Sequence, residues 1–217
     1  KYHAGFEPLP KGFVYAPMGD LEAVKRLVGP QTAAILIEPI QGEGGVRPAP
    51  AGFLASLRAL CDQHGLLLLI DEVQTGIGRT GTPFAYQHDG IKPDAISLAK
   101  SLGNGLPIGA MVCSDAVGKA LPSGTHGSTF GGNPVAAAAA VATWDLATTP
   151  QMLASNVEKG ALLHRLGNEL KARKPGRVVE CRGRGLLFGI EVDTGAADVV
   201  ARCRQNGLLV NLAGEKT

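Results

Sequence analysis

Three short apolar runs organise the first half of the chain, at residues 33–37, 66–70 and 95–98, and each leads into a polar residue. Runs of this length and composition are typical of strands in a parallel sheet that is covered on both faces. Between the first two runs, apolar side chains recur at helical spacing ahead of Gly65, at Phe53, Leu54, Leu57, Leu60 and Cys61. Because glycine commonly ends helices, this pattern predicts one strand–helix–strand unit.

The rest of the chain continues to mix strands and helices. Residues 108–113 predict another strand, and Asn133 followed by Pro134 predicts the start of an alanine-rich helix that runs to about residue 148. Further helices are predicted over about 151–174 and near 196–206, with strand-like runs at 185–192 and 208–212.

These elements together predict an α/β fold in two parts. Residues 1–149 should form a mostly parallel sheet between helices, as the second half of a large domain. Residues 150–217 should form part of a smaller α/β C-terminal domain.

Composition narrows the class of partner. The 217 residues are 45% hydrophobic, and 21 Lys and Arg against 19 Asp and Glu leave a formal charge of +2. A nearly neutral chain gives no electrostatic case for binding nucleic acid or a membrane surface, and no apolar run approaches the roughly 20 residues of a membrane span. We therefore expect a small molecule as the main partner, no nucleic acid and no membrane.

The cysteines and the chain ends bear on compartment and completeness. Four cysteines lie far apart, without a CxxC pair, and no HExxH motif is present, so neither a disulfide framework nor a zinc site is indicated. We expect reduced thiols, a cytoplasmic location and no metal. The chain starts at Lys1 rather than at Met and ends at Thr217 in a strand-like run, which predicts a fragment.

The polar groups at the ends of the apolar runs carry the candidate chemistry. They are Glu38, Asp71 and Lys100, and ligands of open α/β sheets bind at the carboxyl ends of the strands. An acid and a lysine in such places supply the two charges that pyridoxal 5'-phosphate (PLP) needs. The acid keeps the pyridine nitrogen protonated, and the lysine holds the cofactor aldehyde as an imine.

Two other classes of protein share parts of this pattern. Asp71 and Glu72 after a buried strand also match the acidic strand end of a P-loop ATPase, but no GxxxxGK[ST] motif is present. A non-catalytic scaffold with the same fold is the other alternative, because fold alone does not confer activity. The literal GxGxxG at Gly76, Gly78 and Gly81 does not directly follow its strand, so a turn-rich lid explains it better than a dinucleotide site.

Four motifs in order resemble the class III aminotransferases, which are fold-type I PLP-dependent enzymes. They are IEPIQGEGG (37–45), LLIDEVQTGIGRTG (68–81), LAKSLGNGLPIGA (98–110) and HGSTFGGNP (126–134). The opening segment KYHAGFEPLPKGFVYAPMGDLEAV resembles acetylornithine aminotransferases and their relatives in lysine biosynthesis. The resemblance spans nearly all of the chain and implies the large PLP-binding domain of that fold followed by its small domain.

The resemblance also implies a cofactor-binding set. Lys100 is the lysine that binds PLP covalently, and Asp71 pairs with the pyridine nitrogen, so these two are the expected catalytic residues. Val73 packs against the ring and Gln74 donates to its phenolic oxygen. Glu72 is included among the expected cofactor-binding residues.

Substrate recognition is implied at three further positions and in a partner subunit. Glu43 resembles the glutamate that pairs with an arginine when an amine is bound and releases it for the second substrate, and that arginine is expected outside this chain. Glu38 and Ser128 complete the substrate-binding set. Thr129, beside Ser128, resembles a segment that reaches the phosphate of the other subunit, which implies a homodimer with shared active sites.

The implied reaction moves the terminal amine of N2-acetylornithine to 2-oxoglutarate, a step of arginine biosynthesis. Ornithine, succinyl-diaminopimelate or a carrier-bound lysine precursor are alternative amines. The chain is then a fragment of a PLP-dependent aminotransferase that lacks the N-terminal part and the extreme C-terminus.

Overall fold

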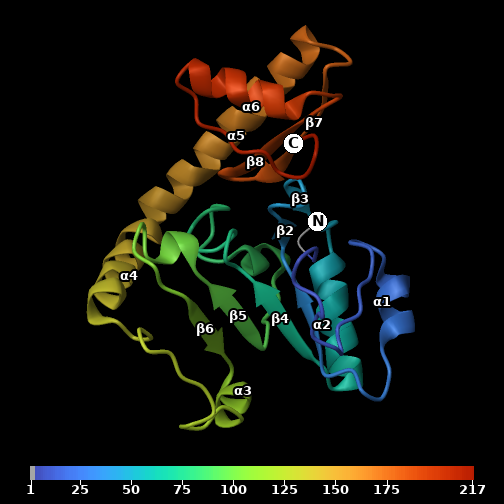
Figure 1. The fold of residues 1–217 in the computed structure, drawn as a ribbon, viewed down its shortest axis with the longest axis vertical. Helices are drawn as coiled ribbons and strands as arrows, with labels where there is room; N and C mark the ends of the chain where they lie inside the picture. The colour runs from blue at the N-terminus through green and yellow to red at the C-terminus, as the bar shows by residue number, and fades with distance from the viewer. Residues whose placement is uncertain (1–2) are drawn as a thin grey trace.

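A four-stranded sheet forms the base of the molecule in the computed structural model, which describes residues 3–217; Lys1 and Tyr2 of the opening segment lie outside the described residues. The strand order is β1-β4-β5-β6. Strands β1 (Ala34–Ile37), β4 (Leu67–Asp71) and β5 (Ala95–Leu98) are parallel, and β6 (Ala110–Cys113) joins β5 as an antiparallel edge. All four strands were predicted, and the α/β architecture is confirmed (Figure 1).

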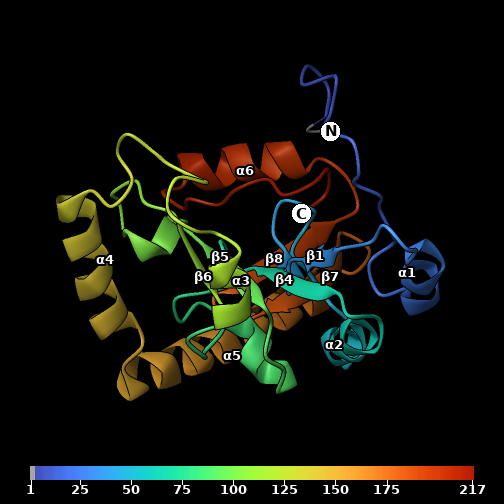
Figure 2. The same cartoon turned by 90° about the horizontal axis from the view of Figure 1, so that it is seen from below.

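Helix α2 (Phe53–His64) covers one face of this sheet, and α1 (Leu21–Leu27) lies beside α2 (Figure 2). The side chains of Leu54, Leu57 and Leu68 are essentially fully buried between helix and sheet. Each such burial stabilises the fold by about 2 kcal/mol. Gly65 adopts a left-handed conformation with φ of 66° and its N–H bonds the carbonyl of Cys61, so the predicted helix end is confirmed.

The prediction that the strands are covered on both faces is right for β5 and wrong for the edges of the sheet. Three of the four β5 residues are buried. In contrast, the Leu36 side chain on β1 is 62% exposed, and Met111 on β6 is 53% exposed. No helix of the described chain packs over these positions, so the edge strands keep an uncovered apolar face.

The connections around the sheet are short elements. They are β2 (Ile40–Gln41), β3 (Arg47–Pro48), the 3-10 helices η1 (Ala85–Asp89) and η2 (Lys100–Leu102), and α3 (Asp115–Lys119). Helix α4 (Pro134–Ala147) starts as predicted, because the Asn133 side chain accepts hydrogen bonds from the backbone N–H groups of Val135 and Ala136.

The second part of the chain rises from the sheet along α5 (Pro150–Arg173), as Figure 1 shows. Strands β7 (Val178–Arg184) and β8 (Leu187–Val192) form an antiparallel hairpin, with α6 (Ala196–Gln205) beside it. The predicted strand at 185–192 corresponds to β8 and the helices are confirmed. The predicted strand at 208–212 is wrong, because these residues pair with no described strand and the Leu209 side chain is 83% exposed. The domain boundary near residue 150 stays a prediction.

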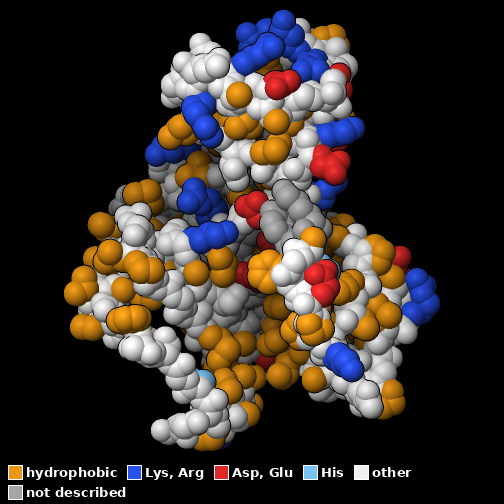
Figure 3. Space-filling view, viewed as in Figure 1, with side chains coloured by type: hydrophobic (Ala, Val, Ile, Leu, Met, Phe, Trp, Pro, Cys, Tyr) orange, Lys and Arg blue, Asp and Glu red, His pale blue; other side chains and the backbone are white. Residues whose placement is uncertain are grey.

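Side chains of different kind gather on different parts of the surface. In Figure 3, Lys and Arg gather at the top, over the part that holds α6 and β7, and hydrophobic side chains gather below, over the sheet and α4. No helix among residues 3–217 is both long enough and apolar enough to cross a membrane.

Asp94 ties α2 to the sheet. Arg58 on α2 donates to Asp94 Oδ2 at 2.7 Å, and the backbone N–H of Leu68 donates to the same oxygen at 2.8 Å. Burial acts to raise the pKa of Asp94, but the hydrogen bonds from Arg58 and Leu68 outweigh it and hold that pKa below its ordinary value. The ionised carboxylate is therefore the form that stabilises the fold.

We expect Asp94→Asn to lower the free energy of unfolding by about 2 kcal/mol at pH 7. A depressed pKa contributes stability above the unfolded-state value of about 4, and that stability is lost as the pH falls through the folded-state pKa. Denaturant unfolding should therefore show a smaller cost at pH 3 than at pH 7. Asp62→Asn is the control, because Asp62 also contacts Arg58 at 2.7 Å but is 66% exposed. Equal costs for the two variants would contradict this assignment.

Candidate active site

The carboxyl ends of the three parallel strands bring the predicted polar groups to one edge of the sheet. Glu38 follows β1, Asp71 ends β4 and Lys100 follows β5. In the register, Ile37 lies beside Ile70, and Asp71 lies beside Ser97. Two carboxylates and one ammonium group therefore share this edge.

The pKa of Glu38 is affected by the charges of both other groups at this edge. Burial raises the pKa of Glu38, and the negative charge of Asp71 raises it further. The N–H of Gly42, which donates to Glu38 Oε2 at 3.1 Å, and the positive charge of Lys100 act in the opposite direction without cancelling the rise. The charges of both Asp71 and Lys100 therefore act on the pKa of Glu38.

Lys100 has an unusual backbone. Its φ is 46°, in the left-handed region that favours glycine, and it opens the short helix η2. A non-glycine residue pays about 1–2 kcal/mol for that conformation, and such strain is typical of functional sites. The Lys100 side chain is exposed in this chain. Lys100 therefore combines a strained backbone with an exposed side chain at the edge of the sheet.

A cavity of about 200 Å³ lies beside Lys100. Its lining consists of Val73, Gln74, Arg79, Lys100, Ser101, Leu186 and Leu187. Asp71 stands at the foot of the same turn, where its Oδ1 accepts a hydrogen bond from the Val73 N–H at 2.9 Å. Four of the predicted residues, Asp71, Val73, Gln74 and Lys100, are therefore brought together.

Glu72 points elsewhere. Its side chain is 1% exposed and accepts hydrogen bonds from the Thr75 hydroxyl and, at 2.9 Å, from the Tyr86 N–H. Burial raises the pKa of Glu72, which these hydrogen bonds partly oppose. The structure thus gives Glu72 partners within the protein core, and its predicted contact with a cofactor stays a prediction.

Glu43 lies on a tight turn that we call the Glu43 loop, residues 42–46. Its backbone closes through hydrogen bonds from the Gly45 and Val46 N–H groups to the Gly42 carbonyl, at 3.1 and 3.0 Å. Gly42 packs so closely against the Gln74 side chain that a Cβ at position 42 would overlap it. The loop therefore joins Glu43 to the cavity wall at Gln74.

Ser128 and Thr129 lie apart from this group. Both are exposed on the connection between α3 and α4, and neither lines the cavity beside Lys100. The neighbouring Phe130 side chain is 82% exposed. Within the described chain, these two predicted site residues are not assembled with the others.

Sequence reasoning missed the part of the wall that comes from the hairpin. Leu186 and Leu187 reach the cavity because the Leu186 N–H donates to the Arg79 carbonyl at 2.9 Å. The glycines around Arg79 also differ from the predicted lid, because Gly76 and Gly78 are buried, Gly76 against Glu72 and Leu98 and Gly78 against α4 and α5. No local sequence pattern predicts a contact between residues as far apart as Arg79 and Leu186. The glycine-rich GRTG segment that contains Arg79 was the available signal that another part of the chain packs closely there.

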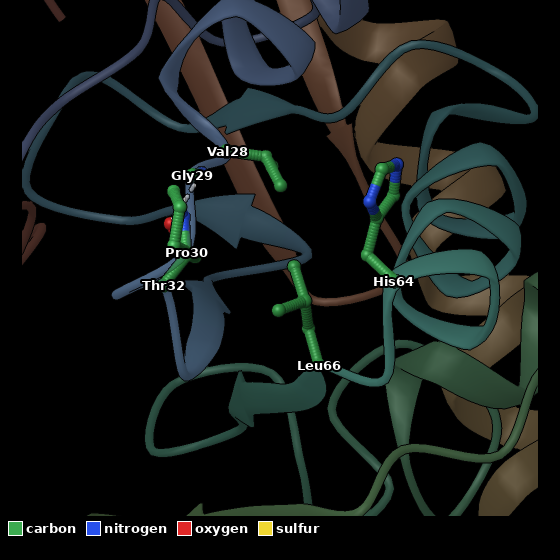
Figure 4. Close-up of a pocket in the computed structure, with 6 residues that line it drawn as sticks. All are labelled: Val28, Gly29, Pro30, Thr32, His64 and Leu66. Atoms are coloured by element: carbon green, nitrogen blue, oxygen red, sulfur yellow. Dashed lines mark hydrogen bonds between the residues drawn. The ribbon is translucent and has the colours of Figure 1, made fainter.

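A second hollow, of about 360 Å³, is unrelated to these groups. Figure 4 shows its lining from the turn after α1 and from the turn after α2, including Val28, His64 and Leu66. Leu66 precedes β4, so this hollow lies at the amino ends of the strands, opposite Asp71 and Lys100. Among residues 3–217, no group of three or more His, Cys, Asp or Glu side chains is arranged to hold a metal ion.

Comparison with known proteins matches the whole chain. The family model "Aminotransferase class-III" covers residues 1–217. The acetylornithine aminotransferase of Myxococcus xanthus is 62% identical over 100% of this chain and 54% of its own length. The N-acetylornithine aminotransferase structure from Stenotrophomonas maltophilia K279a has a TM-score of 0.75 and 41% identity, over 85% of this chain and 49% of that one.

A third relative is an ornithine aminotransferase from Toxoplasma gondii, whose active site holds PLP at partial occupancy. It has a TM-score of 0.89 and 38% identity, over 99% of this chain and 51% of that one. The chain thus spans about half the length of the relatives that it matches. Because the family model covers the chain over its whole length, the chain belongs to the class III aminotransferase family.

Proposed function

We propose that this sequence is part of a PLP-dependent aminotransferase that moves the terminal amine of N2-acetylornithine to 2-oxoglutarate. The observation that carries the proposal is the meeting of Asp71 and Lys100 at neighbouring strand ends, beside a cavity lined by Val73 and Gln74. Because the chain belongs to the class III aminotransferase family, we no longer consider the P-loop ATPase alternative.

The residues present fit PLP. The Asp71 carboxylate, at the foot of the turn that holds Val73, suits a protonated pyridine nitrogen, and the Lys100 amine one strand away suits the aldehyde. The apolar Val73 side chain and the Gln74 amide in the cavity wall suit a ring with a phenolic oxygen. When bound, PLP would supply an electron sink for the charge that forms as a C–H bond of the substrate breaks.

The chain's own residues then bind, orient and move protons. Asp71, held by the Val73 N–H, would pair with a protonated ring nitrogen. The Lys100 amine would hold the cofactor and, when free, would move the proton of the amine-bearing carbon of the substrate. Val73 and Gln74, which line the same cavity, would orient the ring.

The choice of substrate rests on relatives. Acetylornithine aminotransferases are the proteins that the whole chain resembles at up to 62% identity. We assign the enzyme to arginine biosynthesis in the cytoplasm, where the four free thiols would stay reduced. Glu43 and Glu38, at the site edge, are the proposed contacts to substrate, together with Ser128.

We further propose a homodimer with shared sites. Thr129 and Phe130 lie on an exposed connection rather than beside Lys100. Phe130 is followed along the chain by the exposed apolar side chains of Val135, Val141 and Leu146 on α4, and an extended apolar surface is characteristic of an interface. In this arrangement Thr129 binds the phosphate in the site of the partner subunit, which explains why it is not assembled with Lys100 here.

The test uses this sequence within a chain of the relatives' full length, which we call the whole enzyme. With PLP, we expect an absorbance band of the bound cofactor that borohydride reduces, and peptide mapping should place the reduced adduct on Lys100. A panel of amines with 2-oxoglutarate should then give N2-acetylornithine the highest kcat/KM. An adduct on another lysine would overturn the site, and cofactor binding without turnover of any amine would favour the scaffold alternative.

A further inference from the structure

Arg182 on β7 is buried, with 8% of its surface exposed. An arginine taken out of water must have its charge and its donors matched, because an unmatched buried charge costs several kcal/mol. Its partners lie on its own hairpin, on a loop far away in sequence and at Thr217, whose hydroxyl accepts a hydrogen bond from Arg182 Nη2 at 2.8 Å. The role of Arg182 therefore follows from which of these partners it holds in position.

The far partner is the Glu43 loop. Arg182 Nε donates to the Gly45 carbonyl at 2.8 Å and to the Val46 carbonyl at 3.1 Å, and Nη2 donates to the Gly45 carbonyl at 2.6 Å. These carbonyls lie two and three residues from Glu43. The guanidinium group thus binds the backbone at one end of the loop, while Gly42 at the other end packs against Gln74.

Two carboxylates fix the guanidinium itself. Arg182 Nη1 donates to Glu180 at 2.7 Å and to Glu191 at 2.6 Å, and Glu191 is also 3.7 Å from Arg47 at the end of the loop. Charge-assisted hydrogen bonds of this kind are short and directional. The β7–β8 hairpin therefore presents the arginine to the loop in one orientation.

The loop needs such support because its backbone is strained. Val46 has a φ of 50° and is 7% exposed. A β-branched residue adopts the left-handed conformation only where packing and hydrogen bonds around it hold the backbone there. Gly189 on β8 supplies the fit, because a Cβ there would lie 2.9 Å from the Cβ of Val46.

We propose that Arg182 is a positioning residue: it holds the Glu43 loop on the hairpin, so that Glu43 and, through Gly42, Gln74 keep the geometry in which they meet substrate and cofactor. This inference rests on the proposed function for the identity of those ligands. The anchoring itself rests on the contacts of Arg182. Arg182 does not line the cavity beside Lys100, so its effect would pass through the loop.

The test compares Arg182→Gln with the parent in the whole enzyme. We expect hydrogen exchange at the Gly45 and Val46 amides to become at least about tenfold faster, because the turn loses its anchor. We expect kcat/KM for the amine to fall by about 100-fold, the scale of a misplaced contact, with bound PLP unchanged. Arg182→Lys keeps the charge but cannot serve both carbonyls and both carboxylates, so it should recover part of the activity.

Arg177→Gln is the matched control, since Arg177 precedes the same strand and makes an exposed ion pair with Asp193 at 2.7 Å; it should change neither readout. If Arg182→Gln does not fold, Gly189→Ala decides in its place: it presses on Val46 without removing a charge and should produce the same two changes. Unchanged exchange at Gly45 and Val46 would overturn this inference whatever the activity. A parent enzyme without aminotransferase activity would instead overturn the proposed function.

Discussion

Lys100→Ala should abolish turnover in the whole enzyme, with a fall in kcat of at least about 10⁴-fold. One positioned group for proton transfer contributes about 10²–10⁴-fold by itself, and this variant also loses the covalent hold on the cofactor. Single-turnover and steady-state assays with N2-acetylornithine measure the loss. Lys92→Ala is the control, because Lys92 is an exposed lysine before the opposite end of the same strand, β5. Turnover that survived in Lys100→Ala would remove Lys100 from the mechanism.

The backbone of Lys100 allows a second comparison at the same position. Lys100→Gly lacks the amine just as Lys100→Ala does, but glycine adopts the left-handed φ of 46° without steric cost. We expect both variants to be inactive and the glycine variant to be more stable than the alanine variant by about 1 kcal/mol. Thermal unfolding of the cofactor-free proteins measures this difference. A more stable alanine variant would show that the backbone is not strained at this residue.

The strand-end groups could be predicted because the physics behind them is local. Apolar runs of four or five residues mark buried strands, and parallel strands send their carboxyl ends to one edge. Asp71 and Lys100 therefore had to be neighbours once β4 and β5 were paired. The left-handed backbone of Lys100 left no such mark, because nothing in the residue type favours it.

Other features depend on partners that are distant in sequence. The burial of Glu72 follows from the Tyr86 N–H, 14 residues away, and the burial of Arg182 follows from carbonyls 136 and 137 residues away. Neither contact has a local signature. The exposure of the apolar edge strands and of Phe130 was equally unpredictable, because the residue types do not show which apolar side chains a helix will cover.

The second large effect that we expect is a loss of kcat in Asp71→Asn. Asparagine keeps the shape of the side chain and can still accept a hydrogen bond from the Val73 N–H, but it lacks the negative charge that we propose as the partner of the protonated ring nitrogen. Removing one preorganised electrostatic partner typically costs about 10²–10³-fold in kcat. We therefore expect a loss of that size with thermal stability nearly unchanged.

The charge of Asp71 also acts on its neighbour, and this gives an independent check. The negative charge of Asp71 raises the pKa of Glu38, after the larger effect of burial. In Asp71→Asn the repulsion disappears, so the pKa of Glu38 should fall, which NMR titration of the Glu38 carboxyl can follow. Asp198→Asn, an exposed substitution on α6, should affect neither kcat nor Glu38. If Asp71→Asn lowered the Glu38 pKa but left kcat unchanged, Asp71 would be a neighbour of the site without being the partner of the ring nitrogen.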